Sequence, residues 1–258
     1  MKYAVMSDVH ANPDALAKAV DDARTCGAET FVCLGDIVGY GPSPDEAITL
    51  SREVFGNRVV VGNHDAALLR EMSMDSFSRR AQKSIAAQRC MLGYENLAWL
   101  AKRPFLIREG SLIFAHGNVH RDGDALNAGF GYVFRPEDVK HVLSAVDGTG
   151  ANIVFVGHTH EPALWRQNDE GAIVMVEDDK ISIGASDKYV INVGTVGCPR
   201  SVPFASYALV DAKEDDTVAV ELRKLSFNHL GYRDSLLAAN ADVPIWLEDH
   251  VSRLRCSK

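Results

Sequence analysis

Cysteine is sparse in this chain of 258 residues. The cysteines are five in number and lie far apart, and no Cys-x-x-Cys pair occurs among Cys26, Cys33, Cys90, Cys198 and Cys256. An odd, dispersed set gives little support to a disulfide framework or to a zinc site built from thiolates.

Long apolar runs are also missing. The N-terminal residues contain no hydrophobic stretch of signal-peptide length, and no segment approaches the ~18 uninterrupted apolar residues that cross a bilayer. We therefore expect a cytoplasmic protein that has no membrane partner.

Positive charge is in deficit, because the formal net charge is -8. Proteins that coat nucleic acid hold its phosphates mainly with Lys and Arg, so stable nucleic-acid binding is not expected. A small phosphorylated ligand is still compatible with this balance, since bound metal ions add positive charge that the formal count omits.

Low-complexity tracts, internal repeats and linkers rich in Pro, Gly or Ser are absent. Hydrophobic residues make up 47% of the chain and charged residues 24%, which are ordinary values for a globular protein. This length can form a substantial core, and we predict one domain over residues 1–258.

Short apolar runs alternate with helical stretches, a pattern typical of α/β folds. The runs are nearly continuous, which suits strands covered on both faces. We predict strands at about 2–7, 30–34, 58–61, 111–115, 152–156 and 189–193.

Two helix starts are marked by capping residues followed by proline, at Asn12 and at Ser43. Further helices are predicted at about 75–102, 135–146 and 233–254. Additional strands are predicted at 172–177, 205–210 and 218–225, in a second sheet.

Five of the six predicted strands are followed by residues that can bind metal. Sites in open α/β sheets assemble at the carboxyl ends of the strands, so these residues should converge although they are spread along the chain. Single aspartates after strands are usually turn or cap residues, and single histidines are often buried for structural reasons. The full set is Asp8 and His10, Asp36, Asn63 with His64 and Asp65, His116, and His158 with His160.

Imidazole, carboxylate and amide donors without thiolates suit divalent Mn, Fe, Zn or Ni, of which we favour Mn. Two such ions leave a positive centre that attracts phosphate, and a water bridging them loses its proton near neutral pH and attacks phosphorus. An imidazole that is not a ligand can protonate the leaving oxygen or bind the phosphoryl group. His64, beside Asn63, is the best candidate for that role.

These ordered motifs resemble those of the calcineurin-like metallophosphoesterase superfamily. The resemblance extends from residue 8 to residue 160, with each short motif in the family's order. It implies an α/β fold that is a four-layer α/β/β/α sandwich of two mixed β-sheets flanked by helices. It also implies a binuclear metal-dependent phosphoric ester hydrolase.

The resemblance further implies how the ligands are divided. One ion would be bound by Asp8, His10, Asp36 and His160, and the other by Asp36, Asn63, His116 and His158. Asp36 would then bridge the two ions. His64 would be the catalytic or phosphate-binding imidazole, with Asp65 as the residue that orients it.

Two further residues are candidates for binding substrate phosphate. Arg200 ends the segment 192–200, which is similar to a stretch in compact bacterial members that cleave phosphodiesters or dinucleoside polyphosphates. Its guanidinium offers a forked donor to phosphate oxygens. His120 follows His116 by four residues and could touch substrate, whereas Tyr40 could equally stack on a base or pack under a loop.

One departure from the family pattern bears on the substrate. Protein Ser/Thr phosphatases of the superfamily, and symmetrical dinucleoside tetraphosphatases, carry an Arg after their Gly-Asp motif. Residues 38–41 here are Val-Gly-Tyr-Gly. The missing Arg weakens the interpretation as a protein phosphatase or as a symmetrical dinucleoside tetraphosphatase. From the motifs as a whole we expect hydrolysis of small nucleotide-like substrates, either phosphodiesters or dinucleoside polyphosphates. The alternatives are a catalytically silent metal-binding scaffold and a protein phosphatase, and a homodimer is left open.

Overall fold

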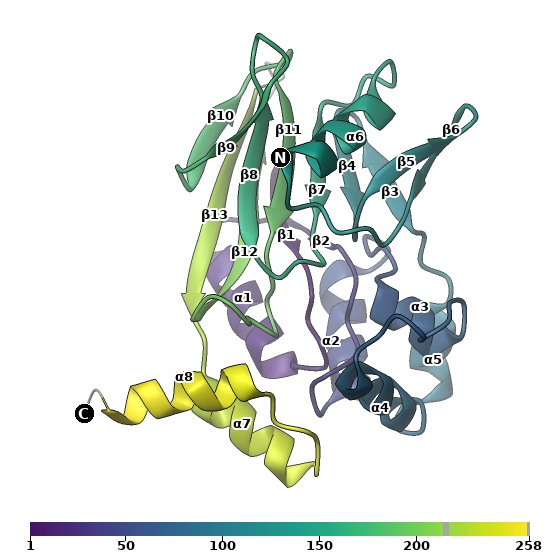
Figure 1. Cartoon of the computed structure of the whole chain (residues 1–258), viewed down its shortest axis with the longest axis vertical. Coiled ribbons are helices and arrows are strands. Elements are labelled where there is room, and N and C mark those ends of the chain that lie inside the picture. The colour runs from purple at the N-terminus through teal and green to yellow at the C-terminus, as the bar shows by residue number, and fades with distance from the viewer. Residues whose placement is uncertain (214–216, 257–258) are drawn as a thin grey trace.

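Two mixed β-sheets packed face to face form the centre of the computed structural model, which describes residues 1–213 and 217–256 (Figure 1). In spatial order, the first sheet contains β10 (Lys180–Ile183), β13 (Val218–Ser226), β12 (Phe204–Ala212), β1 (Lys2–Met6) and β2 (Thr30–Cys33). The second contains β3 (Leu106–Glu109), β4 (Leu112–Ala115), β7 (Ile153–Val156), β11 (Lys188–Val193), β8 (Pro162–Gln167) and β9 (Ile173–Val176).

Helices and one hairpin surround the sheets. The hairpin of β5 (Val119–Asp122) and β6 (Ala125–Ala128) projects from the body of the molecule (Figure 1). The helices are α1 (Pro13–Thr25), α2 (Pro44–Phe55), α3 (Asn63–Leu69), α4 (Arg79–Gln88), α5 (Tyr94–Leu100), α6 (Pro136–Val146), α7 (His229–Ala238) and α8 (Ile245–Cys256).

The alternating side chains of β1 explain the layers. Ala4 and Met6 face one way and pack with residues of α1 and α2, whereas Tyr3 and Val5 face the second sheet. On the far side, α6 covers the outer face of β4, β7 and β11. The layers are therefore helix, sheet, sheet and helix, and the predicted four-layer fold is confirmed.

Parallel pairing brings the carboxyl ends of several strands to one edge. β1 runs parallel to β2 in the first sheet, and β7 runs parallel to both β4 and β11 in the second. Every predicted metal-binding motif except that of Asn63 follows β1, β2, β4 or β7. This edge is where the site lies.

The prediction that the three additional strands lie together in a second sheet was wrong. Two of the three additional strands, β12 and β13, join β1 in the first sheet, and the third, β9, joins β8 in the second. β12 runs antiparallel to β1 and continues that sheet, because its buried residues supply the same inner layer.

Three predicted elements differ from the structure. The segment 58–61 is no regular strand, since it pairs through a single bridge between Val59 and Cys33, and the Val61 amide donates to the Pro104 carbonyl outside both sheets. The helix expected over 75–102 is divided into α4 and α5, and the helix expected over 233–254 is divided into α7 and α8.

The helix caps, the cysteines and the length of the helices can also be compared with what the sequence predicts. The Asn12 side chain caps α1 by accepting a hydrogen bond from the Ala15 amide, whereas Ser43 makes no such bond at α2. Cys26, Cys33, Cys90 and Cys198 are free thiols. Among the described residues no helix has the length and apolar character needed to span a bilayer.

The last two helices, α7 and α8, pack on one another around a small hydrophobic cluster of their own. They lie together at one end of the molecule, in yellow in Figure 1. The assignment of residues 1–258 to one domain stays a prediction.

The layer between the sheets should dominate stability. Phe114 and Phe155 stack there with centroids 5.4 Å apart, and both are fully buried. Phe155→Ala should lower the free energy of unfolding by about 3 to 5 kcal/mol, because it leaves a cavity between two rigid sheets. Urea denaturation measures this. Tyr94→Ala, at a side chain 85% exposed, should change stability by less than about 0.5 kcal/mol, and a loss no larger in the Phe155 variant would contradict this view of the core.

Candidate metal centre

All the predicted metal-binding side chains converge in one buried cluster at the carboxyl edge of the two sheets. None is more than 8% exposed. The converging residues are Asp8, His10, Asp36, Asn63, His116, His158 and His160.

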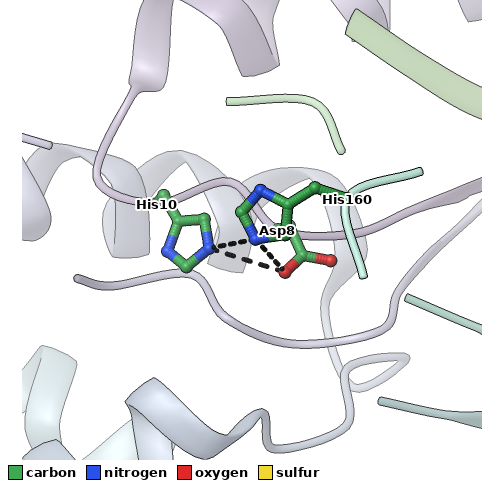
Figure 2. Close-up of side chains that lie close together, drawn as sticks. All are labelled: Asp8, His10 and His160. Carbon is green, nitrogen blue, oxygen red and sulfur yellow. Dashed lines mark hydrogen bonds and ion pairs between the residues drawn. The ribbon is translucent and has the colours of Figure 1, made fainter. Parts of the chain in front are cut away.

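The first group in this cluster consists of Asp8, His10 and His160 (Figure 2). The Oδ1 atom of Asp8 lies 3.1 Å from Nε2 of His160 and 3.5 Å from Nε2 of His10. The two imidazole Nε2 atoms are 3.0 Å apart. These three side chains thus direct donor atoms to one point.

The second group consists of Asp36, His116 and His158, with Asn63 beside them. Nε2 of His116 lies 3.4 Å from Oδ2 of Asp36 and 3.0 Å from Oδ1 of Asn63. Nδ1 of His158 lies 3.2 Å from the same His116 nitrogen. Four donors from four segments therefore meet at a second point.

The Asp36 carboxylate lies between the two groups. Its Oδ2 atom is 3.7 Å from Nε2 of His10 in the first group and 3.4 Å from Nε2 of His116 in the second. Its Oδ1 atom accepts a hydrogen bond of 2.8 Å from the His64 backbone amide. The carboxylate is therefore held in one orientation where it can serve both groups.

Asp8 is held in the same way. Its Oδ2 atom accepts hydrogen bonds from the Ser7 hydroxyl, at 2.6 Å, and from the His158 amide, at 3.0 Å. Its Oδ1 atom is buried without a hydrogen-bond partner among the described residues, although two imidazoles lie within 3.5 Å. An unpaired buried carboxylate oxygen is costly unless a cation is bound to it.

Backbone carbonyls fix the orientation of three of the imidazoles. Nδ1 lies 2.9 Å from the Val38 oxygen in His10, 2.8 Å from the Leu34 oxygen in His116, and 2.6 Å from the Cys198 oxygen in His160. A proton on Nδ1 that is donated to a carbonyl leaves the lone pair on Nε2, which is the usual arrangement around metal-binding histidines.

The backbone of this cluster is strained. Asp8, His10, Asp36, His158 and His160 all have φ between 48° and 67°, the left-handed region that non-glycine residues rarely adopt. Such strain collects at functional sites, where the surrounding structure enforces it. Here it turns each chain segment back so that its side chain faces the shared edge.

Glycine permits the segments to approach so closely. A Cβ atom on Gly157 would collide with the Ser7 hydroxyl and the Asp8 carboxylate, and one on Gly62 would collide with Asp36. Both positions must lack a side chain for the two carboxylates to keep their places.

Charge interactions within the cluster are strong. Burial raises the pKa of Asp8, but the adjacent His160 and His10 outweigh it, so this pKa lies well below its usual value. Burial lowers the pKa of His116, but Asp36 outweighs it and raises the value to about 9. The pKa of His160 is also raised to about 9, because Asp8 outweighs burial and Arg200.

The residues present therefore fit divalent cations. The donors are carboxylate, imidazole and amide groups, which suit Mn, Fe, Zn or Ni. They are buried, oriented by further hydrogen bonds, and include a carboxylate oxygen without a hydrogen-bond partner.

His64 lies beside the cluster at the second position of α3. Its ring lies against Tyr40, Phe77 and His10, with centroids 4.6, 5.2 and 4.9 Å away. Burial lowers the pKa of His64 well below its usual value, so the imidazole is neutral at pH 7. It also lies close enough to His10 and Asp36 to share a metal with them, which leaves the ligand role to experiment.

Asp65 does not orient His64 as expected. Its carboxylate accepts hydrogen bonds from the backbone amides of Gly62, Ile37 and Val38, at 3.1, 3.0 and 3.2 Å. These bonds tie the start of α3 to the loop after β2, because Asp65 occupies the N3 position of the helix and faces backwards. Burial and the nearby Asp36 raise the pKa of Asp65 to about 7.

A cavity of about 530 Å³ opens onto the cluster, and Asp36, His158 and His160 form part of its wall. Arg200 lines it too, and its Nη2 atom lies 3.1 Å from Nε2 of His160. The guanidinium also lies 5.0 Å over the ring of Tyr40. The Arg200 guanidinium could therefore contact a phosphate bound at the cluster.

His120 is not brought to the cavity. It is exposed on β5 and does not line the cavity wall. The hairpin carries it away, so its predicted contact with substrate has no support.

The aromatic wall of the cavity was not predicted from the sequence. Phe130 and Tyr132 line the cavity together with Tyr40, and both belong to a loop outside regular structure. Phe77 falls within the helix predicted over 75–102, but it precedes α4 and lines the cavity. A signal was present in residues 129–132, where glycine alternates with aromatic residues immediately before α6.

Sequence comparison agrees with this geometry. A profile of the calcineurin-like phosphoesterase superfamily domain matches residues 1–215. The chain belongs to this superfamily. It is therefore a metal-dependent phosphoric ester hydrolase by family, and its cluster of aspartates and histidines could hold metal ions.

Two of three similar proteins cover most of the chain, and the third covers about a third of it. An uncharacterized protein of Methanocaldococcus jannaschii is 35% identical over 216 residues, which are 82% of this chain and 83% of that protein. The crystal structure of a metallophosphoesterase from Sphaerobacter thermophilus is 29% identical, with a TM-score of 0.76 and 98% of both chains covered. A symmetrical bis(5'-nucleosyl)-tetraphosphatase of Neisseria meningitidis is 31% identical over 94 residues, 36% of this chain and 34% of that enzyme.

The raised pKa values predict how metal binding depends on pH. His116 and His160 carry protons below their pKa values of about 9, and a bound cation must displace those protons. The affinity for Mn²⁺ should therefore rise as the pH increases toward 9 and level off above it. Calorimetric titrations in buffers of different ionisation enthalpy would count the released protons, and a pH-independent affinity without proton release would contradict the assignment.

Proposed function

We propose that the protein binds two divalent ions, Mn²⁺ by preference, and hydrolyses phosphodiester or phosphoanhydride bonds of small nucleotide-like substrates. The observation that carries the proposal is the position of Asp36, whose Oδ2 atom faces both groups of ligands. One ion is assigned to Asp8, His10, Asp36 and His160. The other is assigned to Asp36, Asn63, His116 and His158.

Two divalent ions held at these positions would supply positive charge to the phosphoryl group and would lower the pKa of a coordinated water. The protein's own contribution starts with orientation. The Ser7 hydroxyl and the amides of His158 and His64 hold one oxygen of each carboxylate and leave the other free to bind. The site therefore needs little rearrangement when substrate enters.

Arg200 and His64 complete the proposed site. The Arg200 guanidinium lines the cavity and can donate two hydrogen bonds to phosphate oxygens. His64 is neutral, because burial lowers its pKa. We therefore assign it a hydrogen bond to the phosphoryl group, in preference to delivery of a proton to the leaving oxygen.

The cavity size and the relatives support a nucleotide-like substrate. A volume of about 530 Å³ lies in the range that holds small organic ligands and cofactors. The relative from Neisseria meningitidis that is similar over 94 residues bears the name of a dinucleoside tetraphosphatase. We extend only the substrate class to this chain. Symmetrical tetraphosphatases carry an Arg after their Gly-Asp motif, whereas residues 38–41 of this chain are Val-Gly-Tyr-Gly.

The alternatives are less well supported. A catalytically silent scaffold would be expected to lack some of the candidate metal ligands or the additional imidazole of His64. In this chain the candidate ligands and His64 all lie together. A protein phosphatase would be expected to carry the missing Arg. We further propose a cytoplasmic location, and we leave a homodimer open.

Hydrolysis should depend on the metal and on the shared carboxylate. Aryl phosphates, phosphodiesters and dinucleoside polyphosphates form the test panel, and activity should disappear with chelator and return with Mn²⁺. Asp36→Ala should abolish turnover and lower the bound metal from two ions toward none, as measured by elemental analysis. Asp169→Ala, at an exposed turn residue, is the matched control. No turnover of any substrate by the Mn²⁺-loaded wild-type protein would refute the function.

Replacing His64 tests whether it binds the phosphoryl group or is a metal ligand. His64→Ala should keep the bound metal and lower kcat by about 10²-fold to 10³-fold, the range lost when one hydrogen-bond donor to the transition state is removed. Because the pKa of His64 is depressed, activity of the wild type should show no inflection from this residue near pH 6.5. Loss of an ion from the His64 variant would make the residue a ligand and overturn the assignment.

A further inference from the structure

A loop from Gly129 to Phe134 places aromatic rings at the edge of the metal centre. Phe130 and Tyr132 line the cavity. The Tyr132 ring lies face to face with the imidazole of His158, with centroids 4.0 Å apart and planes inclined by 10°. An aromatic surface therefore begins directly beside a candidate metal ligand.

Two of these rings are unusually open to solvent. Tyr132 is 52% exposed and Phe134 is 54% exposed, and they contact each other edge to face at 6.0 Å. Between them Val133 is 2% exposed and packs in the core with residues of α6. The buried Val133 side chain therefore anchors the loop, and this anchored backbone holds the two rings at the surface.

Hydrogen bonds fix this loop to the metal-binding segment after β4. The Asn118 amide donates to the Gly131 carbonyl, the Gly131 amide donates to the Asn118 side chain, and the Gly129 amide donates to the Asn118 carbonyl, at 3.0, 2.8 and 2.8 Å. A Cβ on Gly117 would lie 2.8 Å from both loop carbonyls, so the close approach requires glycine there. Asn118 follows His116 by two residues, and the rings therefore keep a set distance from the metal centre.

We propose that Tyr132, which Phe134 supports edge to face, forms a subsite that stacks on an aromatic ring of the substrate while its phosphoryl group lies at the metal centre. The proposal rests on the phosphoesterase function above and adds a specificity element to it. One face of Tyr132 is covered by His158, and the exposure of half its surface leaves the other face open to a ring.

The chemistry of the subsite defines its ligand. Stacking accepts any planar aromatic ring, because every nucleobase presents a π face, and no base-specific hydrogen bond is needed. The subsite should favour nucleotides and aryl phosphate esters over esters of aliphatic alcohols. It should discriminate weakly among the bases.

Two substitutions of Tyr132 test this directly. In Tyr132→Leu, the ratio of kcat/KM for an adenylate diester to that for a glycerol phosphate diester should fall by about 5-fold to 100-fold. Tyr132→Phe retains the ring and should retain the ratio. Tyr94→Leu, at an aromatic residue 85% exposed on α5 and outside the cavity wall, is the matched control and should leave the ratio unchanged.

Other outcomes would overturn the subsite. An unchanged ratio in Tyr132→Leu would do so, and so would an equal loss on both substrates with loss of Mn²⁺, since Tyr132 would then act through His158. Phe134→Leu, at the ring that contacts Tyr132 edge to face but does not line the cavity, should lower the same ratio in the same direction because it loosens Tyr132, and it guards against a misfolded Tyr132 variant.

Direct binding separates this proposal from the catalytic one. Adenosine 5'-monophosphate should bind the Mn²⁺-loaded wild type more tightly than ribose 5-phosphate does, and Tyr132→Leu should remove that difference. Calorimetry gives this result even if no ester is hydrolysed. Equal affinities in the wild type would refute the subsite, whereas the difference without turnover would refute only the hydrolytic function.

Discussion

The whole site depends on the placement of one carboxylate between two groups of imidazoles. Asp36 is 1% exposed and is held by a hydrogen bond from the His64 backbone amide. Its free oxygen is within 3.7 Å of an imidazole on either side. If it were rotated or displaced, each group would lose the oxygen that it shares with the other, and the positive centre that we assign to phosphate would not form.

Keeping such a group buried is costly, and much of the surrounding structure offsets that cost. Burial alone would raise the pKa of Asp36, yet the charge of the adjacent His116 outweighs that effect and holds the carboxyl ionised. Positive φ angles at five of the ligands add strain of about 1 to 2 kcal/mol each. The two sheets and their helices supply the rigid frame in which this strain persists.

The sequence predicted the chemistry of the site better than its surroundings. The candidate ligands other than Asn63 were predicted because they follow buried strands, and parallel strands end at one edge. Their role as metal ligands stays a prediction. The role of Asp65 could not be predicted, since its bonds to Ile37 and Val38 depend on α3, whose short span was not anticipated. The aromatic loop at 129–134 was missed because it has no helical or strand periodicity.

Element boundaries failed for related reasons. The apolar spacing in residues 75–102 continues across the gap between α4 and α5, so it suggested one helix. Gly93, which caps α5, is the residue that marks the gap. Pro244 likewise precedes α8 and ends the helical pattern predicted over 233–254. The division of strands between sheets could not be predicted because β12 and β13 return from the end of the chain to pair beside β1. Local periodicity does not encode such long-range pairing.

The central claim is that two cations share Asp36. Anomalous scattering from crystals soaked in Mn²⁺ tests it most directly, because each bound ion gives its own peak. We predict two peaks, one on either side of the Asp36 carboxylate, with Asp8 and His160 at the first and His116 and Asn63 at the second. A single peak, or peaks that leave Asp36 without contact to either ion, would contradict the account.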